Sequence, residues 1–172
     1  MNMLIRSEQE KDFDQIYDLV KNSFASAPVK DGTEQEIVNK LRKSNKYIPE
    51  LALVIERERK IIGYVMLTKF FIQGKTQKFE SLLLAPVAIS TDFQNQKLGT
   101  ELIEKSFERA KEMGHTNVIV VGDPNYYHRF GFRASIEFGI DNMEGLPTQY
   151  VMAYELIPNG LKDKMGRVSL KL

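Results

Sequence analysis

The segment GDPNYYHRFGF, residues 122–132, gathers chemically capable side chains directly after an apolar run. Residues 117–121 are β-branched and apolar, which is typical of a buried strand. A phenol at such a strand end, such as Tyr127, can donate a proton to a developing anion or can pack as an aromatic wedge. Tyr126 is interpreted as structural or substrate-facing. His128 is an alternative base, although a loop histidine beside an arginine is usually just exposed.

A second segment, LLLAPVAISTDFQNQKLGTELI, residues 82–103, joins a strand to the start of a helix. Pro86 removes a ladder donor, which favours a bulge, an edge or a place where strands part. Strands that part there would leave the backbone groups of residues 87–89 open to an extended ligand. The helix begins near Gly99, and the free N–H groups of a helix start suit a phosphate. An ordinary strand–helix turn is the alternative, and neither a P-loop nor a dinucleotide fingerprint is present.

Together the two segments resemble the GNAT superfamily of acyl-CoA-dependent N-acyltransferases, and the order of the expected elements agrees over nearly the whole chain. The family signature Gln/Arg-x-x-Gly-x-Gly/Ala at the pyrophosphate loop corresponds to residues 94–99, QNQKLG. The second signature, Tyr-x-x-x-Gly-Phe, corresponds to residues 127–132, YHRFGF. The preceding Gly-Asp-Pro is similar to a bacterial branch of small, uncharacterised GNAT proteins.

Two positions depart from the family pattern. Lys97 stands where the family has the first glycine of the pyrophosphate signature. It either keeps the backbone path and adds a positive charge, which we favour, or disturbs the phosphate cradle. Val120 stands where an asparagine often precedes the tyrosine. The usual polar contact would then be missing or supplied by Asp123 or Asn125.

The resemblance implies acetyl-CoA as co-substrate, an amine as acceptor and no metal. The pantetheine arm would lie along the strand after Pro86, and the pyrophosphate over the loop that follows. The amine would attack the thioester, a backbone N–H would stabilise the oxyanion, and Tyr127 would protonate the leaving CoA thiolate. Glu80 is the candidate base, directly or through water, unless it is only a surface carboxylate. The implied cofactor-binding residues are Val87, Ala88, Ile89, Gln94, Asn95, Gln96, Lys97, Leu98, Gly99, Thr100 and Asn125.

Two other hypotheses keep the fold without the reaction. The first is a non-catalytic acyl-CoA-binding sensor or regulatory module, which the Lys97 departure would fit. The second is an interaction domain that binds no nucleotide. Turnover with any amine separates the enzyme from the sensor, and CoA binding separates both from the interaction domain. The acceptor is not identified, and a weak indication of a cationic amine comes from acidic residues in two loops, namely Asp31, Glu34, Glu137, Asp141 and Glu144.

The elements that must position these residues follow from hydrophobic periodicity. Asp12 with Gln15, and Thr33 with Glu36, are expected to form capping pairs at two helix starts. By resemblance, the order predicts one α+β domain over residues 1–172, with a mixed, mainly antiparallel sheet, a central splayed strand pair and helices on both faces. The tail after residue 156 is not placed. The expected elements are a strand at 4–6, helices at 12–24 and from 33, a hairpin over 50–71, a strand at 79–89, a helix ending at Gly114, and strands at 117–121 and 150–156.

Composition excludes several functional classes. The chain has 172 residues and a formal net charge of +1, so no global field draws it to nucleic acid or to an anionic membrane. It has no cysteine and two histidines, which excludes disulfides and disfavours transition-metal chemistry. No apolar stretch approaches the roughly 18 residues of a membrane span, and no signal peptide is evident, which favours a cytoplasmic protein. Homodimers are frequent in the resembled family.

Overall fold

The computed structural model describes residues 3–27, 30 and 32–171. The chain forms two compact units, each described here by itself. The first contains the residues up to Thr68 together with Ala85–Arg109, and the second contains Lys69–Leu84 and Ala110–Leu172. Strands β3 (Lys60–Gln73) and β4 (Lys78–Ile89) each begin in one unit and end in the other.

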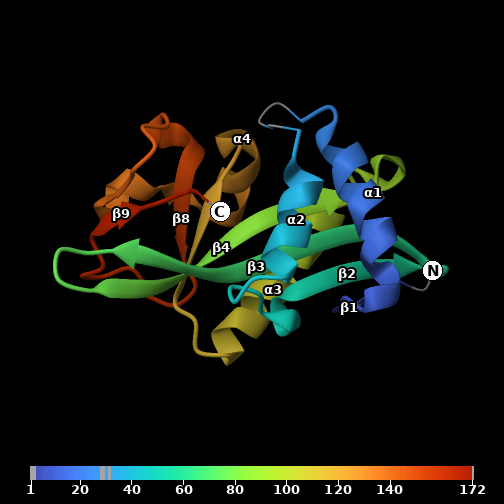
Figure 1. The fold of residues 1–172 in the computed structure, drawn as a ribbon, viewed down its shortest axis with the longest axis horizontal. Coiled ribbons are helices and arrows are strands. Elements are labelled where there is room, and N and C mark those ends of the chain that lie inside the picture. The colour runs from blue at the N-terminus through green and yellow to red at the C-terminus, as the bar shows by residue number, and fades with distance from the viewer. Residues whose placement is uncertain (1–2, 28–29, 31, 172) are drawn as a thin grey trace. The chain divides into compact units, whose positions relative to one another are not determined.

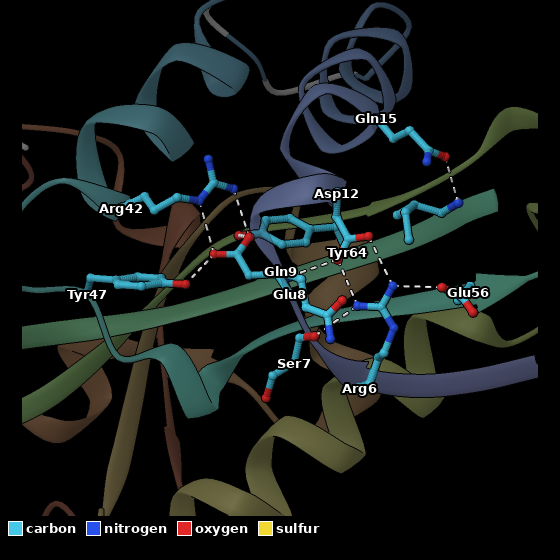
Figure 2. A network of polar contacts seen from close by, with 11 residues as sticks. Arg6, Ser7, Glu8, Gln9, Asp12, Gln15, Arg42, Tyr47, Glu56 and Tyr64 are labelled. Atoms are coloured by element: carbon cyan, nitrogen blue, oxygen red, sulfur yellow. Dashed lines mark hydrogen bonds and ion pairs between the residues drawn. The ribbon is translucent and has the colours of Figure 1, made fainter. Parts of the chain in front are cut away.

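In the first unit an antiparallel sheet is covered by helices on two sides. Strand β1 (Met3–Ser7) pairs with β2 (Ala52–Arg57), and β2 pairs with β3. Helices α1 and α2 lie on one face of these strands and α3 on the other (Figure 1, Figure 2). The helices are α1 (Phe13–Phe24), α2 (Glu34–Arg42) and α3 (Leu98–Glu112), and short 3₁₀ turns lie at Glu10–Asp12, Pro49–Leu51 and Thr91–Phe93.

Alternation along β3 explains this two-sided packing. Successive side chains of a strand point to opposite faces. A side chain at Gly63 would meet Leu102 of α3 at 3.1 Å, whereas the next residue, Tyr64, directs its hydroxyl to Glu8, which also binds Arg42 of α2. Both faces of β3 are therefore buried, and its sequence reads as a continuous apolar run rather than an alternating one.

The expected helices are present, but their capping pairs are not the expected ones. Asp12 forms a capping box with Gln9, while Gln15 accepts a hydrogen bond from the Ile61 backbone at 3.0 Å. Thr33 precedes α2 without a side-chain capping bond, and the capping prediction there is wrong as well. Spacing alone suggested these pairs, but tertiary contacts gave Gln15 a different partner.

The second unit surrounds the parallel strand pair. Leu83 and Leu84 of β4 pair in parallel with Ile119 and Val120 of β5 (Asn117–Val121), the direction expected of two neighbouring strands joined by a helix. Strand β4 continues to Ile89 beyond these paired residues. The remaining elements are β6 (Arg133–Ala134), β7 (Ile140–Asn142), β8 (Val151–Glu155), β9 (Gly166–Val168), helix α4 (Pro124–Tyr127) and 3₁₀ turns at His128–Phe130, Ser135–Phe138 and Thr148–Tyr150.

Most strand pairings are antiparallel, which confirms the mixed α+β prediction. Strand β8 pairs with β5 and β6, and β9 pairs with β3 at Gln73 and with β7. The tail that could not be placed from sequence thus contains β9. It is also held by Lys164, whose Nζ donates to Thr116 Oγ1 and to the Gly160 carbonyl, both at 2.9 Å.

Candidate cofactor and catalytic site

The end of β4 carries the residues expected to bind pantetheine. The Ala85–Pro86 peptide bond is cis. Ala88 is buried, while Val87 and Ile89 on either side of it are half-buried. Ile89 packs where Gly63 has no side chain, since a Cβ there would lie 3.1 Å from Ile89 Cδ1. The strand end is thus fixed on one side by packing within the first unit.

The next segment, residues 94–100, is named the cofactor loop below. Its first four residues are exposed, and Leu98 and Gly99 are buried. The Glu101 N–H donates to the Lys97 carbonyl at 3.1 Å, which is the first bond of helix α3. The N–H groups of the three residues between them precede that bond and have no carbonyl partner within the helix. Free backbone N–H groups that converge at the positive end of a helix dipole can bind a phosphate.

Lys97 adopts the left-handed backbone conformation, with φ of 62°. This conformation costs an L-residue about 1–2 kcal/mol, whereas glycine adopts it freely. A glycine at this position would adopt the conformation without that cost, and Lys97 adopts it despite its side chain. Asn95 is also left-handed, with φ of 64°. Its side chain tolerates that region better than most.

In the second unit, a short helix carries Tyr127. Asp123 is its N-cap, and its carboxylate accepts a hydrogen bond from the Asn125 backbone at 3.0 Å. Pro124 occupies the first helical position, where a missing N–H costs nothing. The Gly-Asp-Pro sequence is therefore a helix start. The Asp123 carboxylate caps the helix, and the exposed Asn125 side chain stays a candidate for the polar contact that Val120 cannot make.

The Tyr127 ring is held by close contacts. A Cβ on Gly122 would lie 2.6 Å from Tyr127 Cε2, so this glycine leaves the space that the ring fills. The ring meets Tyr126 and Phe132 edge to face, with centroid distances of 5.0 and 5.7 Å. Burial, followed by the neighbouring Tyr126 and Asp123, raises the pKa of Tyr127 above that of free tyrosine. The phenol is therefore protonated at neutral pH, as a proton donor must be.

The other residues of the YHRFGF signature have structural roles. Gly131 has φ of 95°, and a Cβ there would lie 2.9 Å from the Tyr154 ring. Phe132 is fully buried, as expected for a core residue, and Phe130 is half-buried. His128 is exposed. Gly131 permits the left-handed turn after which Phe132 packs edge to face against Tyr127.

Glu80 lies away from Tyr127 within the second unit. Its backbone carbonyl accepts a hydrogen bond from Asn117 Nδ2 at 3.3 Å, at the amino end of β5. Tyr127 follows the opposite end of that five-residue strand, which spans roughly 13 Å. The Glu80 side chain is exposed. Burial lowers the pKa of the neighbouring His115 while the Glu80 carboxylate opposes the shift. The structure does not bring Glu80 and Tyr127 together.

The acidic residues of the expected acceptor loops have partners of their own. Glu137 binds Arg133 at 2.8 Å, and Asp141 accepts from the Asn142 backbone at 2.8 Å. Glu144 accepts from the Leu170 backbone at 2.7 Å. Glu34 lies at the start of α2, and Asp31 lies outside the described residues. These intramolecular uses weaken the indication of a cationic acceptor.

A buried polar network surrounds Glu8, and no sequence motif predicted it (Figure 2). Both Glu8 oxygens accept from Arg42, at 2.8 and 3.0 Å, and Tyr47 and Tyr64 also donate to the same carboxylate. The Glu8 side chain is 1% exposed and that of Arg42 is 9% exposed. Nearby, Arg6 binds Asp12 and Glu56 at 2.7 Å each. The partners of Glu8 are distant in sequence, so no local motif could reveal them.

Two further features of the described residues bear on function. No group of three or more histidine, cysteine or acidic residues among residues 3–27, 30 and 32–171 could hold a metal ion. None of the helices in this part of the chain has the length and apolar character needed to cross a membrane.

Comparison with known proteins identifies the family to which the chain is similar. A family model described as an acetyltransferase (GNAT) domain matches residues 4–135. The chain is 30% identical over 130 residues to the uncharacterized N-acetyltransferase YhbS of Escherichia coli K12, which covers 76% of this chain and 73% of YhbS. The uncharacterized N-acetyltransferase YjhQ of the same strain is 30% identical over 99 residues, or 58% of this chain and 55% of YjhQ.

Solved structures show the same fold. Escherichia coli YhbS in complex with CoA has a TM-score of 0.87 and 26% identity, covering 98% of this chain and 89% of that chain. A GNAT family acetyltransferase from Brucella melitensis in complex with acetyl-CoA has a TM-score of 0.75 and 23% identity, covering 97% and 93%.

Proposed function

Because this chain belongs to the GNAT acetyltransferase family, we propose that it transfers the acetyl group of acetyl-CoA to a primary amine of an unidentified small molecule or protein. The cofactor loop carries this proposal. Lys97 keeps the left-handed backbone at the glycine position of the family signature, and α3 begins directly after it. The CoA and acetyl-CoA complexes of the two structural relatives support the same co-substrate.

The cofactor would bind to the first unit through backbone groups. The pantetheine arm would lie along Val87–Ile89, as an added strand. The pyrophosphate would lie over Gln94–Thr100, where the free N–H groups of the helix start face it. Lys97 would add a positive charge to this contact. By family resemblance, Asn125 is a further proposed polar contact to the cofactor.

The reaction forms one bond and breaks one. The neutral amine nitrogen attacks the thioester carbonyl carbon, a backbone N–H stabilises the resulting oxyanion, and the C–S bond then breaks. Tyr127 donates its proton toward the leaving CoA sulfur. The attacking nitrogen loses a proton as the amide forms, and this proton, carried by water, restores the phenol, so the products are the amide and the CoA thiol. A thiol has a pKa near 8.5 and burial raises the pKa of Tyr127, so complete transfer is uphill. A hydrogen bond to the developing thiolate already lowers the barrier before transfer is complete.

The amine must lose a proton before or during attack. An alkyl amine has a pKa near 10.4 and is mostly charged at neutral pH. We propose Glu80 of β4 as the base. Because it lies beside the amino end of β5 and Tyr127 follows the carboxyl end, it would act through a relay of water molecules rather than directly. Glu80→Gln should slow turnover most below pH 8, where little neutral amine is available, and should leave affinity for acetyl-CoA unchanged.

A turnover assay tests the proposal. The protein is incubated with acetyl-CoA and a panel of polyamines, amino sugars and lysine-containing peptides, and both free thiol and acetylated product are measured. Thiol release that requires an amine and gives a matching acetylated product is expected. Binding of acetyl-CoA without turnover across the panel would favour the sensor hypothesis instead.

By the same family resemblance we propose a homodimer in the cytoplasm. Light scattering should give the mass of two chains, and a mass of one chain would contradict the dimer. Cell fractionation should recover the protein with the soluble cytoplasmic fraction.

A further inference from the structure

We propose that the β2–β3 hairpin sets the conformation of the cofactor loop, and that Arg57 is a positioning residue for the nucleotide half of acetyl-CoA. This inference rests on the proposed function, because it requires the CoA pyrophosphate to bind residues 94–100. The contacts that support it lie within the first unit. They join the hairpin to Ser90–Phe93, which is named the entry turn below because it leads from β4 into the cofactor loop.

The hairpin ends in an unusual two-residue turn. Glu58 and Arg59 both have positive φ, 49° and 66°. Tight hairpins favour such a turn because its twist matches that of the strands, but asparagine and glycine usually fill these positions. Strained backbone persists where the surrounding structure holds it, and it clusters at functional sites. The strained turn is therefore held in place by the contacts that the hairpin makes.

A β-bulge lies next to this turn. Ile55 of β2 pairs with Gly63, but the following Glu56 pairs with Ile61, so Ile62 has no partner in β2. Bulges re-aim neighbouring groups and are frequent near active sites. The Ile62 carbonyl here accepts a hydrogen bond from the Ser90 N–H at 2.8 Å. The bulged residue thus holds the first residue of the entry turn.

The other end of the entry turn is held by Arg57. Its guanidinium carbon lies 5.0 Å from the centroid of the Phe93 ring, within cation–π range. The Phe93 N–H donates to the Ser90 carbonyl at 2.9 Å, which closes the turn. Phe93 directly precedes Gln94, the first residue of the cofactor loop. The hairpin therefore fixes both ends of the segment from which the loop departs.

This arrangement would matter for affinity through preorganisation. The backbone N–H groups of the loop bind a phosphate well only if they already converge, because ordering them on binding costs free energy. Loss of the Arg57–Phe93 contact should release the entry turn and weaken nucleotide binding. A cation–π contact of this exposure is equivalent to roughly a two- to fivefold change in affinity.

Arg59 offers a matched control. It carries the same charge two residues away and is exposed. Among the described residues it makes no hydrogen bond, ion pair or ring contact. Arg57→Ala and Arg59→Ala remove the same charge from the same hairpin, but only the first removes the contact with Phe93.

The experiment is calorimetric titration of wild type, Arg57→Ala, Arg57→Lys, Phe93→Leu and Arg59→Ala with two ligands. Acetyl-CoA reaches the cofactor loop, whereas acetyl-pantetheine lacks the pyrophosphate. Arg57→Ala and Phe93→Leu should weaken acetyl-CoA binding roughly two- to fivefold and leave acetyl-pantetheine binding unchanged. Arg57→Lys keeps a cation over the ring and should recover part of the affinity. Arg59→Ala should match wild type.

Several results would overturn the inference. Unchanged acetyl-CoA affinity in both Arg57→Ala and Phe93→Leu would show that the contact does not position the loop. An equal loss for acetyl-pantetheine would indicate general damage, and an equal loss in Arg59→Ala would indicate charge attraction alone. If Arg57→Ala does not fold, Phe93→Leu carries the same test. Wild type that fails to bind acetyl-CoA would instead refute the proposed function.

Discussion

Tyr127 shows how a single side chain depends on its neighbours for a chemical role. Gly122 leaves room for its ring, and Phe132 packs against it edge to face. The raised pKa keeps the phenol protonated, but it also makes Tyr127 a weaker acid. Its contribution should therefore be that of an ordinary general acid, and some activity should remain without it.

The first prediction concerns the Tyr127 hydroxyl. Tyr127→Phe should lower kcat by roughly 10²-fold, because it removes the proton donor and keeps the ring that packs against Phe132. Steady-state kinetics with acetyl-CoA and an active amine measures this. Tyr126→Phe removes the neighbouring hydroxyl and should have little effect. A Tyr127→Phe rate within about twofold of wild type would rule out the acid role.

The raised pKa of Tyr127 also predicts a pH profile. A tyrosine with a raised pKa stays protonated through pH 10, so the acid is present while the fraction of neutral amine rises toward that pH. Wild-type kcat should rise with pH up to at least about 9 without a falling limb. A decline that begins near pH 8 and is absent in Tyr127→Phe would contradict the raised pKa of Tyr127, because it would show that this phenol loses its proton there.

Lys97 tests the balance between backbone strain and charge. Lys97→Gly relieves the left-handed conformation and should raise the free energy of unfolding by about 0.5–1 kcal/mol. It should also weaken acetyl-CoA binding at low ionic strength, and the difference should fade in high salt because exposed charges are screened. Asn95→Gly relieves a similar backbone without removing a charge, so it should leave the salt dependence unchanged. Lys97→Gly with wild-type salt dependence would show that the side chain does not meet the phosphate.

At the scale of elements, the Glu8 network holds α2 against the sheet (Figure 2). Arg42 belongs to the last turn of α2, Tyr64 to the middle of β3, and Glu8 follows β1. Burial lowers the pKa of Arg42, whereas its hydrogen bond to Glu8 raises it. The net shift of the pKa is upward. The network therefore joins three elements through one buried carboxylate with four donors.

Removal of that carboxylate should be costly. Glu8→Gln leaves the buried Arg42 charge without its counter-ion, and such losses cost about 3–5 kcal/mol. For a chain of this size that corresponds to a fall in Tm of roughly 6–20 °C, measurable by calorimetry. Glu137→Gln is the control, because its pair with Arg133 is exposed and should contribute less than about 1 kcal/mol. Equal effects of the two changes would contradict a special role for the buried network.

At the scale of the whole molecule, a ligand of the native state stabilises the folded chain. Acetyl-CoA at about 100 times its Kd should add roughly 2.7 kcal/mol to the free energy of unfolding. Tm should then rise by about 5–10 °C in a thermal melt, with a similar shift for CoA and none for AMP. No shift with either CoA species would mean that the cofactor loop does not bind the pyrophosphate, and it would favour the interaction-domain hypothesis.

The sequence by itself determined the helices, most strands, the parallel β4–β5 pair and the two family signatures. These features depend on residues that are near one another in the chain, or on signatures with strict spacing. For example, Gly131 between two phenylalanines indicates a turn, and Lys97 departs visibly from the glycine of the family signature. Only the tertiary structure decided the partners of Glu8, which lie 34, 39 and 56 residues away. It also decided the bulge at Ile62, the contact between Arg57 and Phe93, and the separation of Glu80 from Tyr127. Such contacts depend on strand register and helix packing, and no local pattern records either.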